Sequence, residues 1–368
     1  MRTAEILAHG RENNFNAIRI CAALAVIVSH SFPITLGPDA PEPLEHVLGF
    51  SLGALGVKVF FVISGFLILK SFMQRRSTAS FAMARARRIL PGLAVVGIVV
   101  AFVIGPLLTS LPVQDYLSDS KTALHVPRTI SLFALDLHLP GLFQGNPIVG
   151  NVNGSLWTLP IEVECYAGLA LAGLLGFYRP RLFPLVLVGF VPAYVVARYG
   201  LWAGHDLSAM AGLAFPFLLG MAAYFYRARL PMNVWLLLAL TGIAAAAVGL
   251  DILREELSTV AIGYAGLWLG AADIGLLRSY NRIGDYSYGV YIYGWPMQQV
   301  LAQVLPGLSP LQMMVMAGLA ALACGIVSWH LVEKPALNWR RTRPAADLQA
   351  DKVEGDKTLQ VNREGAYW

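Results

Sequence analysis

The stretch NFNAIRICAALAVIVSHSFPITL, residues 14–36, decides the fold class because it is one apolar run of membrane-crossing length. A helix needs roughly 20 mostly apolar residues to cross the hydrocarbon core of a bilayer. The run is too long for the apolar part of a signal peptide, and it carries two basic side chains, Arg19 and His30. The sequence therefore predicts an uncleaved first transmembrane helix.

Similar apolar stretches recur along the chain, which is 57% hydrophobic and only 13% charged. Soluble proteins carry roughly a quarter charged residues. Ten spans are expected, at residues 15–36, 50–72, 88–110, 155–177, 181–198, 207–226, 232–250, 257–277, 286–305 and 310–332. The abundance of Gly and Ala, with few alternating patterns, favours helices over a barrel. The expected fold is all-α, a polytopic bundle of about ten transmembrane helices.

The distribution of basic residues predicts the orientation, because Lys and Arg collect on the cytoplasmic side of a membrane. With the N-terminus inside, the inner segments and span ends hold 21 of them and the outer ones four, with Arg19 and Lys58 inside spans. An odd number of spans would break this pattern. We therefore expect a multi-pass protein of the inner membrane with both termini cytoplasmic. The pI of about 9.1 then reflects topology, and no nucleic-acid partner is expected.

The composition predicts a single folded domain. Residues 1–14 are expected to form a cytoplasmic tail, residues 15–339 the transmembrane domain, and the polar residues 340–368 a disordered cytoplasmic tail.

No metal site is expected. Cys21, Cys165 and Cys324 lie in apolar spans without metal-ligand spacing, so they are interpreted as buried small side chains. A zinc site built from His330, Glu333 and cysteines fails on spacing.

Arg19 and His30 are eleven residues apart, which places them on one helix face about 16 Å apart along the axis. An ionisable side chain in the hydrocarbon costs about 2.5–3.5 kcal/mol, so such residues usually face a cavity. Arg19 is expected near the cytoplasmic side and His30 in the outer half. A neutral imidazole can accept a proton from a hydroxyl, which makes His30 a candidate general base. The alternative is that His30 only bonds a neighbouring helix or lies at the outer interface.

Glu162 and Glu164 bring carboxylates into an apolar helix, but they point about 200° apart and cannot act as a pair. Glu162 shares a face with Tyr166. It could bind a substrate hydroxyl or orient a base, or it could simply bond another helix or Arg19.

Arg85 and Arg88 lie three residues apart on one helix face, followed by Pro91. The planar guanidinium suits phosphate oxygens, so the cytoplasmic cluster of Arg75, Arg76, Arg85, Arg87 and Arg88 could hold a phosphorylated donor. The alternatives are positive-inside bias and contact with anionic lipid.

Taken together, these segments resemble acyltransferase family 3 of integral membrane proteins. The resemblance covers nearly all of residues 14–340. The segments that carry it, in family order, are NFNAIRICAALAVIVSH (14–30), GALGVKVFFVISGFLI (53–68), RARRILP (85–91), GSLWTLPIEVECY (154–166), IGDYSYGVYIYGWP (283–296) and SWHLVEKP (328–335).

The resemblance implies transfer of an acyl group, often acetyl, from cytoplasmic acyl-coenzyme A to a hydroxyl of an envelope or secreted glycan. It implies donor binding by Arg85 and Arg88, and no metal. The catalytic candidates are His30 as base, Arg19 as a structural or catalytic helper, and Glu162. The acceptor-binding candidates are Ser155, Trp157, Tyr288 and Glu333. Membrane lipid is the other expected partner.

Two residues depart from the family pattern. Asn16 stands where many relatives have Asp, so an ion pair with Arg19 is replaced at best by a neutral hydrogen bond. Gly294 stands where many relatives have a second histidine, which puts an essential role for that histidine in doubt here.

Three alternative functions are left open. The acceptor could be a small molecule or a lipid. A transporter of lipid-linked sugars would show internal repeats and broken helices, and no convincing repeat is visible. A lipid-binding scaffold would leave Arg19 and His30 unexplained.

Overall fold

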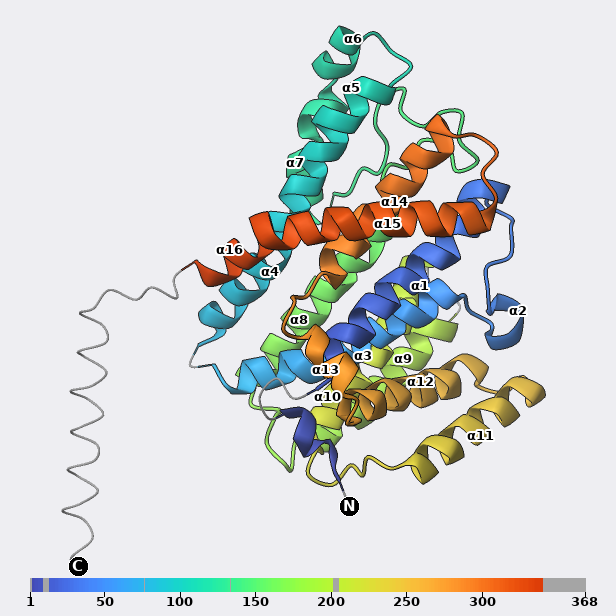
Figure 1. The fold of residues 1–368 in the computed structure, drawn as a ribbon. Coiled ribbons are helices and arrows are strands. Elements are labelled where there is room, and N and C mark those ends of the chain that lie inside the picture. The colour runs from blue at the N-terminus through green and yellow to red at the C-terminus, as the bar shows by residue number, and fades with distance from the viewer. Residues whose placement is uncertain (1, 9–12, 76, 133, 201–204, 340–368) are drawn as a thin grey trace, which may run out of the picture.

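The computed structural model describes residues 2–8, 13–75, 77–132, 134–200 and 205–339. All regular structure in these ranges is helical, apart from two isolated β-bridges (Figure 1). The expected all-α fold is therefore confirmed. The expected tail 340–368 lies outside the described residues.

Most helices follow one another with short connections, and a long connection that includes residues 134–153 precedes the helical turn at Gly154. In chain order they are η1 (Ala4–Ala8), α1 (Phe15–Leu36), α2 (Glu45–Leu48), α3 (Leu52–Met73), α4 (Thr78–Val99), η2 (Val100–Ile104), α5 (Gly105–Leu108), α6 (Val113–Ser118), α7 (Ser120–Ser131), η3 (Gly154–Trp157), α8 (Thr158–Leu174), α9 (Phe183–Tyr199), α10 (His205–Phe225), α11 (Val234–Leu250), α12 (Arg254–Ala271), α13 (Gly275–Tyr280), α14 (Ser287–Val304), α15 (Pro310–Ser328), η4 (Trp329–Glu333) and α16 (Lys334–Asn338).

Five helical segments of the described chain are long and apolar enough to cross a membrane: Phe15–Leu36, Leu52–Met73, Thr78–Leu108, Leu207–Phe225 and Pro310–Asn338. The helices α9 and α11 are apolar but have only 17 residues each, which is about 26 Å and short of the roughly 30 Å hydrocarbon core. The other expected spans are helices too, but α8 is equally short and α12 and α14 have 18 residues each, α12 with charges at its start. The structure thus shows a membrane protein built of helices, while the number of ten spans is not confirmed.

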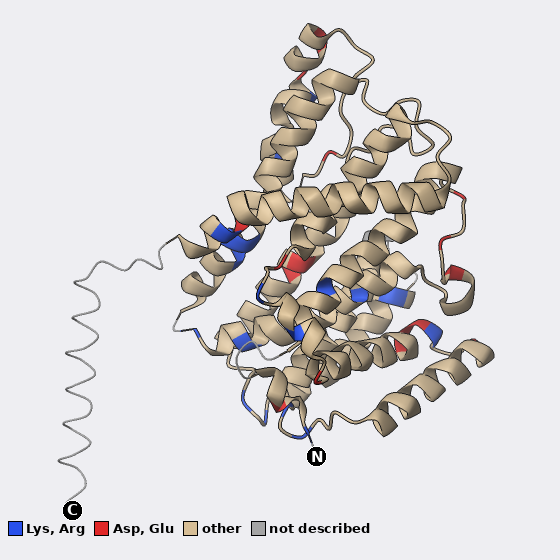
Figure 2. Cartoon of the chain, viewed as in Figure 1, with Lys and Arg blue, Asp and Glu red and all other residues tan. Residues whose placement is uncertain are grey.

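Charged residues are sparse along the helices, as Figure 2 shows, and many of them lie near helix ends and in the connections. The N-terminal segment packs on the bundle instead of trailing from it. Ala4 and Leu7 are fully buried, and Arg227 forms an ion pair with Glu5 at 3.0 Å.

Helix α3 lies in the middle of the bundle and packs against α1, α10 and α12. Its approach to α10 is so close that no side chain fits between the two backbones. A Cβ atom at Gly65 would lie 2.0 Å from the carbonyl oxygen of Phe217, and one at Gly220 would lie 2.0 Å from that of Val62. Small residues permit such close packing between helices in membranes, where dispersion contacts replace the hydrophobic effect.

We expect Gly65→Ala to destabilise the protein by about 1–3 kcal/mol, because the added methyl group forces the α3 and α10 backbones apart. Gly242→Ala is the matched control, since a Cβ atom at this helical position meets nothing within 4 Å. Thermal unfolding of both variants in detergent measures the difference. Equal stability of the two variants would contradict this account of the α3–α10 contact.

Helix α4 begins at Thr78, where the Ser77 side chain caps it by accepting a hydrogen bond from the Ser80 amide at 3.2 Å. This start is ten residues before the expected one at residue 88, because the polar first turns are stabilised by the cap and by packing. Arg85 and Arg88 therefore lie inside the helix. It passes Pro91 and continues through the π-helical turn η2 into α5, which together with α6 and α7 forms the arm at the top of Figure 1.

The segment 134–157 is anchored along α14, and this fixes where α8 begins. The Asn153 amide donates to the carbonyl oxygen of Ile292 at 2.9 Å, and the Trp295 indole donates to that of Asn151 at 3.0 Å. Gly154 is required at this contact, because a Cβ atom there would lie 2.7 Å from the Trp295 ring. The anchor thus positions the start of α8, where Thr158 is buried and the preceding Trp157 is 46% exposed.

Candidate active site

A buried ionic network joins four helical segments at one end of the bundle. Asp285, just before α14, accepts from Arg19 of α1 at 2.5 Å and from Arg88 of α4 at 2.6 Å. Arg88 also reaches Glu333 of η4 at 3.3 Å. The side chains are 19%, 12%, 14% and 1% exposed for Arg19, Asp285, Arg88 and Glu333, so the charges hold one another in place away from water.

Asp285 is the residue of this network that binds both Arg19 and Arg88. Its burial opposes ionisation, but the charges of Arg19 and Arg88 and a hydrogen bond from Ser287 outweigh burial and lower the pKa of this carboxyl to about 2. Asp285 is therefore ionised at neutral pH and balances one of the two arginine charges.

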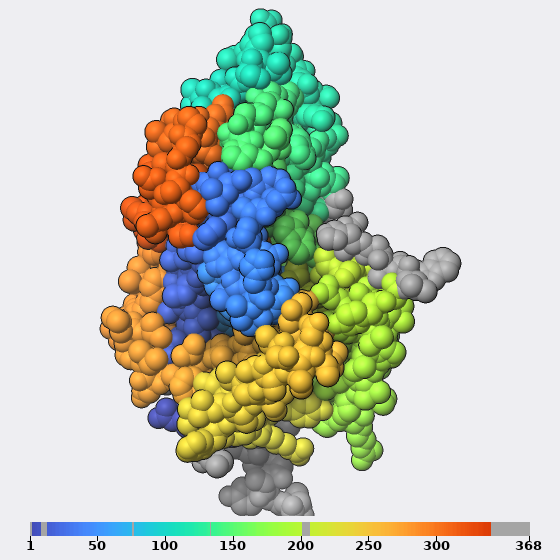
Figure 3. Space-filling model, turned by 90° about the vertical axis from the view of Figure 1, so that its right-hand side faces the viewer, coloured from blue at the N-terminus to red at the C-terminus, as the bar shows by residue number. Residues whose placement is uncertain are grey.

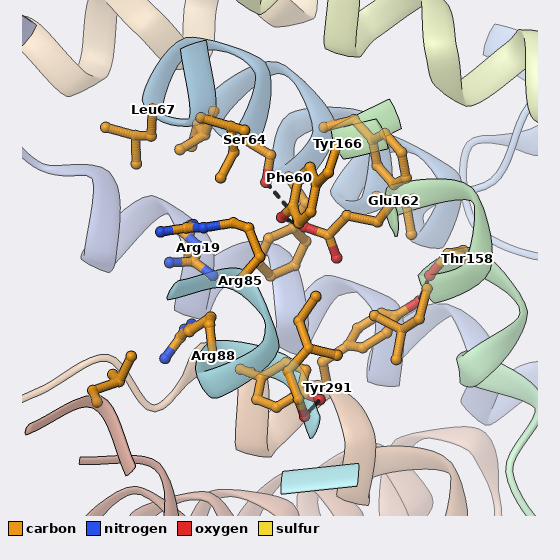
Figure 4. Close-up of a pocket in the computed structure, with 18 residues that line it drawn as sticks. Arg19, Phe60, Ser64, Leu67, Arg85, Arg88, Thr158, Glu162, Tyr166 and Tyr291 are labelled. Carbon is orange, nitrogen blue, oxygen red and sulfur yellow. Dashed lines mark hydrogen bonds between the residues drawn. The ribbon is translucent and has the colours of Figure 1, made fainter. Parts of the chain in front are cut away.

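Arg19 and Arg88 also line a cavity of about 140 Å³, which we call the arginine cavity. Figure 4 shows Arg19, Arg85 and Arg88 together on one side of it, with Glu162, Thr158 and Tyr291 on the other sides. The arginine cavity can hold an anionic or carbonyl-bearing group, because guanidinium groups donate hydrogen bonds in a fixed planar array.

Arg85 differs from its neighbours because no carboxylate pairs with it among the described residues. Its Nε atom is buried without a hydrogen-bond partner, and its guanidinium lies 6.0 Å from the centre of the Phe81 ring. An unpaired buried cation is costly and is normally matched by an anion. Arg85 is therefore the cation of this cavity that is free to bind one.

Glu162 lies across the arginine cavity from these cations and accepts hydrogen bonds from Tyr166 and, at 3.3 Å, from Ser64. The predicted shared face of Glu162 and Tyr166 is thus seen directly. Arg19 pairs with Asp285, so the suggested ion pair between Arg19 and Glu162 is not formed.

His30 lies outside the arginine cavity and lines a second cavity of about 300 Å³, which we call the histidine cavity. Its imidazole contacts the Trp295 ring edge-on, with centroids 4.9 Å apart, and its Nδ1 atom is buried without a hydrogen-bond partner. The imidazole is thus held in place by packing, with one ring nitrogen unpaired. Because Nδ1 is sealed from water, the nitrogen that can accept a proton from a bound hydroxyl is Nε2, in the tautomer that leaves it unprotonated.

The two cavities share a wall. Val57 of α3 and Tyr291 of α14 line both of them. The Tyr291 hydroxyl donates to the Ser155 carbonyl oxygen at 2.7 Å and lies 2.6 Å from Thr158 Oγ1, so the wall is tied to the start of α8.

The comparison with known proteins agrees with this architecture. A family model described as an acyltransferase domain matches residues 12–330. The chain belongs to acyltransferase family 3. It is therefore a membrane acyltransferase.

Three relatives of this family 3 acyltransferase match over most of their length. It is 32% identical to an O-acetyl transferase of Shigella phage Sf6, over 93% of this chain and 99% of that protein. It is 29% identical to nodulation protein 10 of Rhizobium leguminosarum bv. viciae, over 92% and 97%. It is 30% identical to exopolysaccharide production protein ExoZ of Rhizobium meliloti strain 1021, over 80% and 92%. No solved structure matches it.

The predicted site residues of the acyltransferase divide between the two cavities. Arg19, Arg85, Arg88, Glu162 and Tyr288 line the arginine cavity, while His30 and Trp157 line the histidine cavity.

Two predicted acceptor-binding residues line neither cavity. Ser155 is buried and offers its carbonyl oxygen to Tyr291. Glu333 is occupied by Arg88 and by a hydrogen bond from Ser328 at 3.0 Å. Their predicted roles in binding acceptor stay predictions, and their observed contacts are within the protein.

The structure explains one departure from the family pattern. A Cβ atom at Gly294 would lie 2.9 Å from the Ile27 side chain, so α1 and α14 meet too closely there for a larger residue. The partner of Arg19 is Asp285, and no hydrogen bond between Arg19 and Asn16 is seen in the described chain.

Sequence reasoning missed several residues of this acyltransferase. Asp285 stands in the quoted segment 283–296 and was not singled out, although an acidic residue next to a span is itself a signal. Lys58 was noted only as a charge within a span. Its partner Glu255, 197 residues away, had no signal that pointed to it.

Proposed function

We propose that this acyltransferase transfers an acetyl group from acetyl-coenzyme A to a hydroxyl of an envelope or secreted glycan. We further propose that it does so in the inner membrane, with both termini in the cytoplasm. The family supports acyl transfer, and the names of two relatives mention O-acetyl transfer and exopolysaccharide production.

The observation that carries the proposal is the back-to-back arrangement of the two cavities at Val57 and Tyr291. One contains cations suited to the donor, and the other contains an imidazole suited to deprotonating the acceptor. Both reacting groups must come within about 3–3.5 Å of each other, so the thioester must pass between Val57 and Tyr291 to reach the acceptor hydroxyl.

In the proposed reaction the donor enters from the Arg85 side. The arginine cavity, at about 140 Å³, is below the roughly 300–1,000 Å³ of pockets that enclose a drug-sized ligand, so it takes only the acyl-thioester end. Arg85 also lines a neighbouring cavity of about 340 Å³ beside Phe81, and it binds the phosphates from that side. His30 accepts the proton of the acceptor hydroxyl while its oxygen attacks the thioester carbonyl. The C–O bond forms, the C–S bond breaks, and the proton passes to the leaving thiolate.

The direct test uses the full chain in proteoliposomes with acetyl-coenzyme A labelled in the acetyl group. We expect the label to appear in an ester on added bacterial surface glycan, detected by mass spectrometry, and free coenzyme A to be released in equal amount. Release of coenzyme A without an acylated glycan, across neutral and acidic glycans, would reject the glycan acceptor.

We expect Arg85→Ala to raise the KM for acetyl-coenzyme A at least about tenfold, because a charge-assisted hydrogen bond to phosphate is worth roughly 1.5–3 kcal/mol. The protein should fold normally, since no carboxylate of the described chain loses a partner. Steady-state kinetics at saturating acceptor measures the effect. Arg181→Ala, at an exposed position before α9 and outside both cavities, is the matched control, and an unchanged donor KM in Arg85→Ala would reject the donor role.

A further inference from the structure

We propose that the histidine cavity binds the acceptor as an uncharged sugar residue, with Trp157 as a stacking platform and Lys58 and Glu42 as hydrogen-bonding partners. This inference rests on the proposed function and names the acceptor class of the same site. The cavity volume of about 300 Å³ is within the range of small-ligand pockets.

The charges that line the histidine cavity cancel. Lys58 donates to Glu255 at 2.9 Å, and Glu255 also pairs with Arg198. Glu42 adds a second carboxylate, which accepts from Ser29 and has no cationic partner among the described residues. Two cations therefore face two carboxylates. An acidic sugar would bring a further negative charge close to Glu42 in a site of low dielectric, whereas an uncharged one would not.

The same groups keep hydrogen-bonding capacity for hydroxyls. The Lys58 ammonium has three N–H groups and spends one on Glu255, and only one Glu42 oxygen accepts from Ser29. The His30 imidazole lines the cavity, and no hydrogen bond to its Nε2 atom is seen within the described chain. Sugar hydroxyls both donate and accept, so they can satisfy all three groups. An apolar lipid acceptor would leave them unsatisfied, at a cost of about 1–3 kcal/mol each.

Trp157 supplies the apolar surface that a sugar ring also needs. Its side chain is 46% exposed although it lines the cavity, so one part of the indole is uncovered. It precedes Thr158, which lines the arginine cavity, and the anchored segment 134–157 holds it in place. An indole presents a broad apolar face and a polar N–H, which suits the C–H face of a sugar ring.

The segment from residue 37 to Ser51, which carries Glu42, lies over the N-terminal end of α3. Figure 3 shows the start of α3 and the segment before it in the middle of one face of the molecule, between α15 and α11. The chain from residue 37 to Ser51 thus forms part of the cavity rim, and Glu42 ties it to α1 through Ser29. A polymer reaching the cavity would pass this rim.

Two variants test the proposal in the full chain reconstituted in nanodiscs. Trp157→Ala removes the platform, and Lys58→Met removes the ammonium while Glu255 keeps Arg198 as its partner. The matched controls are Trp235→Ala, 77% exposed on α11, and Lys121→Met, an exposed lysine of α7 that lines neither cavity. The probes are the neutral maltotriose and cellotriose and the acidic trigalacturonate.

We expect each cavity variant to raise the KM for the neutral trisaccharide about tenfold, with kcat and the KM for acetyl-coenzyme A within about twofold of the parent. The controls should change none of the three. Trigalacturonate should be the poorer acceptor for the parent. A preference for trigalacturonate, or an unchanged acceptor KM in both variants, would overturn the proposal.

Direct binding separates this inference from the proposed function. Calorimetric titration of His30→Ala protein with maltotriose or cellotriose needs no acyl transfer. The parent protein could bind the trisaccharide, with binding weakened by Trp157→Ala, and yet transfer no acetyl group. That result would reject the proposed function and support the sugar site. Acetyl transfer to other hydroxyl compounds, with no binding of either neutral trisaccharide, would overturn the sugar site alone.

Discussion

His30→Ala is expected to lower acyl transfer by about 10²–10⁴-fold, the usual contribution of general acid–base catalysis. The variant should still insert and fold, because the imidazole makes no hydrogen bond through Nδ1 and its ring contact with Trp295 is a single edge-on packing contact. Transfer of labelled acetyl to glycan measures the loss. Thermal unfolding of the same preparation checks the fold.

His138→Ala is the matched histidine control for His30→Ala. Its side chain is 61% exposed and lines neither cavity, so its removal should leave both transfer and stability unchanged. Full activity of His30→Ala would remove the imidazole from the mechanism. A loss of binding for both substrates, with poor folding, would instead show that His30 has a structural role.

Arg88→Met is expected to destabilise the protein by about 3–5 kcal/mol, which is the usual cost of removing one partner from a buried ionic group. The substitution leaves Asp285 with Arg19 alone and leaves Glu333, 1% exposed, without a cation. The effect is measured by unfolding the protein in detergent. Loss of the monodisperse peak in size-exclusion chromatography reports the unfolding. The activity of Arg88→Met should fall with its stability.

The comparison of Arg88→Met with Arg278→Met isolates burial as the cause. Arg278 also pairs with an aspartate, Asp273, at 2.9 Å, but that carboxylate is 61% exposed. Exposed pairs contribute about 0–1 kcal/mol, so Arg278→Met should be nearly neutral. If Arg88→Met is as stable as Arg278→Met, the four-residue network does not hold the helices together, and Arg88 is free to serve the donor.

Arg85 and Arg88 thus have different expected phenotypes, although they look equivalent in the sequence. Arg85→Ala should affect donor binding in a stable protein, because Arg85 has no carboxylate partner in the described chain. Arg88→Met should first affect stability, because Arg88 binds Asp285 and Glu333. Their three-residue spacing put both on one helix face, but only the partners from α14 and η4 distinguish them.

The sequence by itself determined the helical class, because runs of apolar residues have no alternative to helices in lipid. It also picked out Arg19, His30 and Glu162, because an ionisable group in an apolar run is too costly to be there without a partner. It did not determine the number of spans, since α8, α9 and α11 have 17 residues each, too few to separate a span from a buried helix.

Only the tertiary structure decided which side chains form pairs. Arg19 pairs with Asp285 across 266 positions, Lys58 with Glu255 across 197, and His30 meets Trp295 of α14. It also placed His30 and the arginines in two separate cavities that meet at Val57 and Tyr291. Periodicity fixes which side of a helix a residue occupies, but the helix that covers this side is chosen by packing between segments far apart in the chain, and no local pattern records that choice.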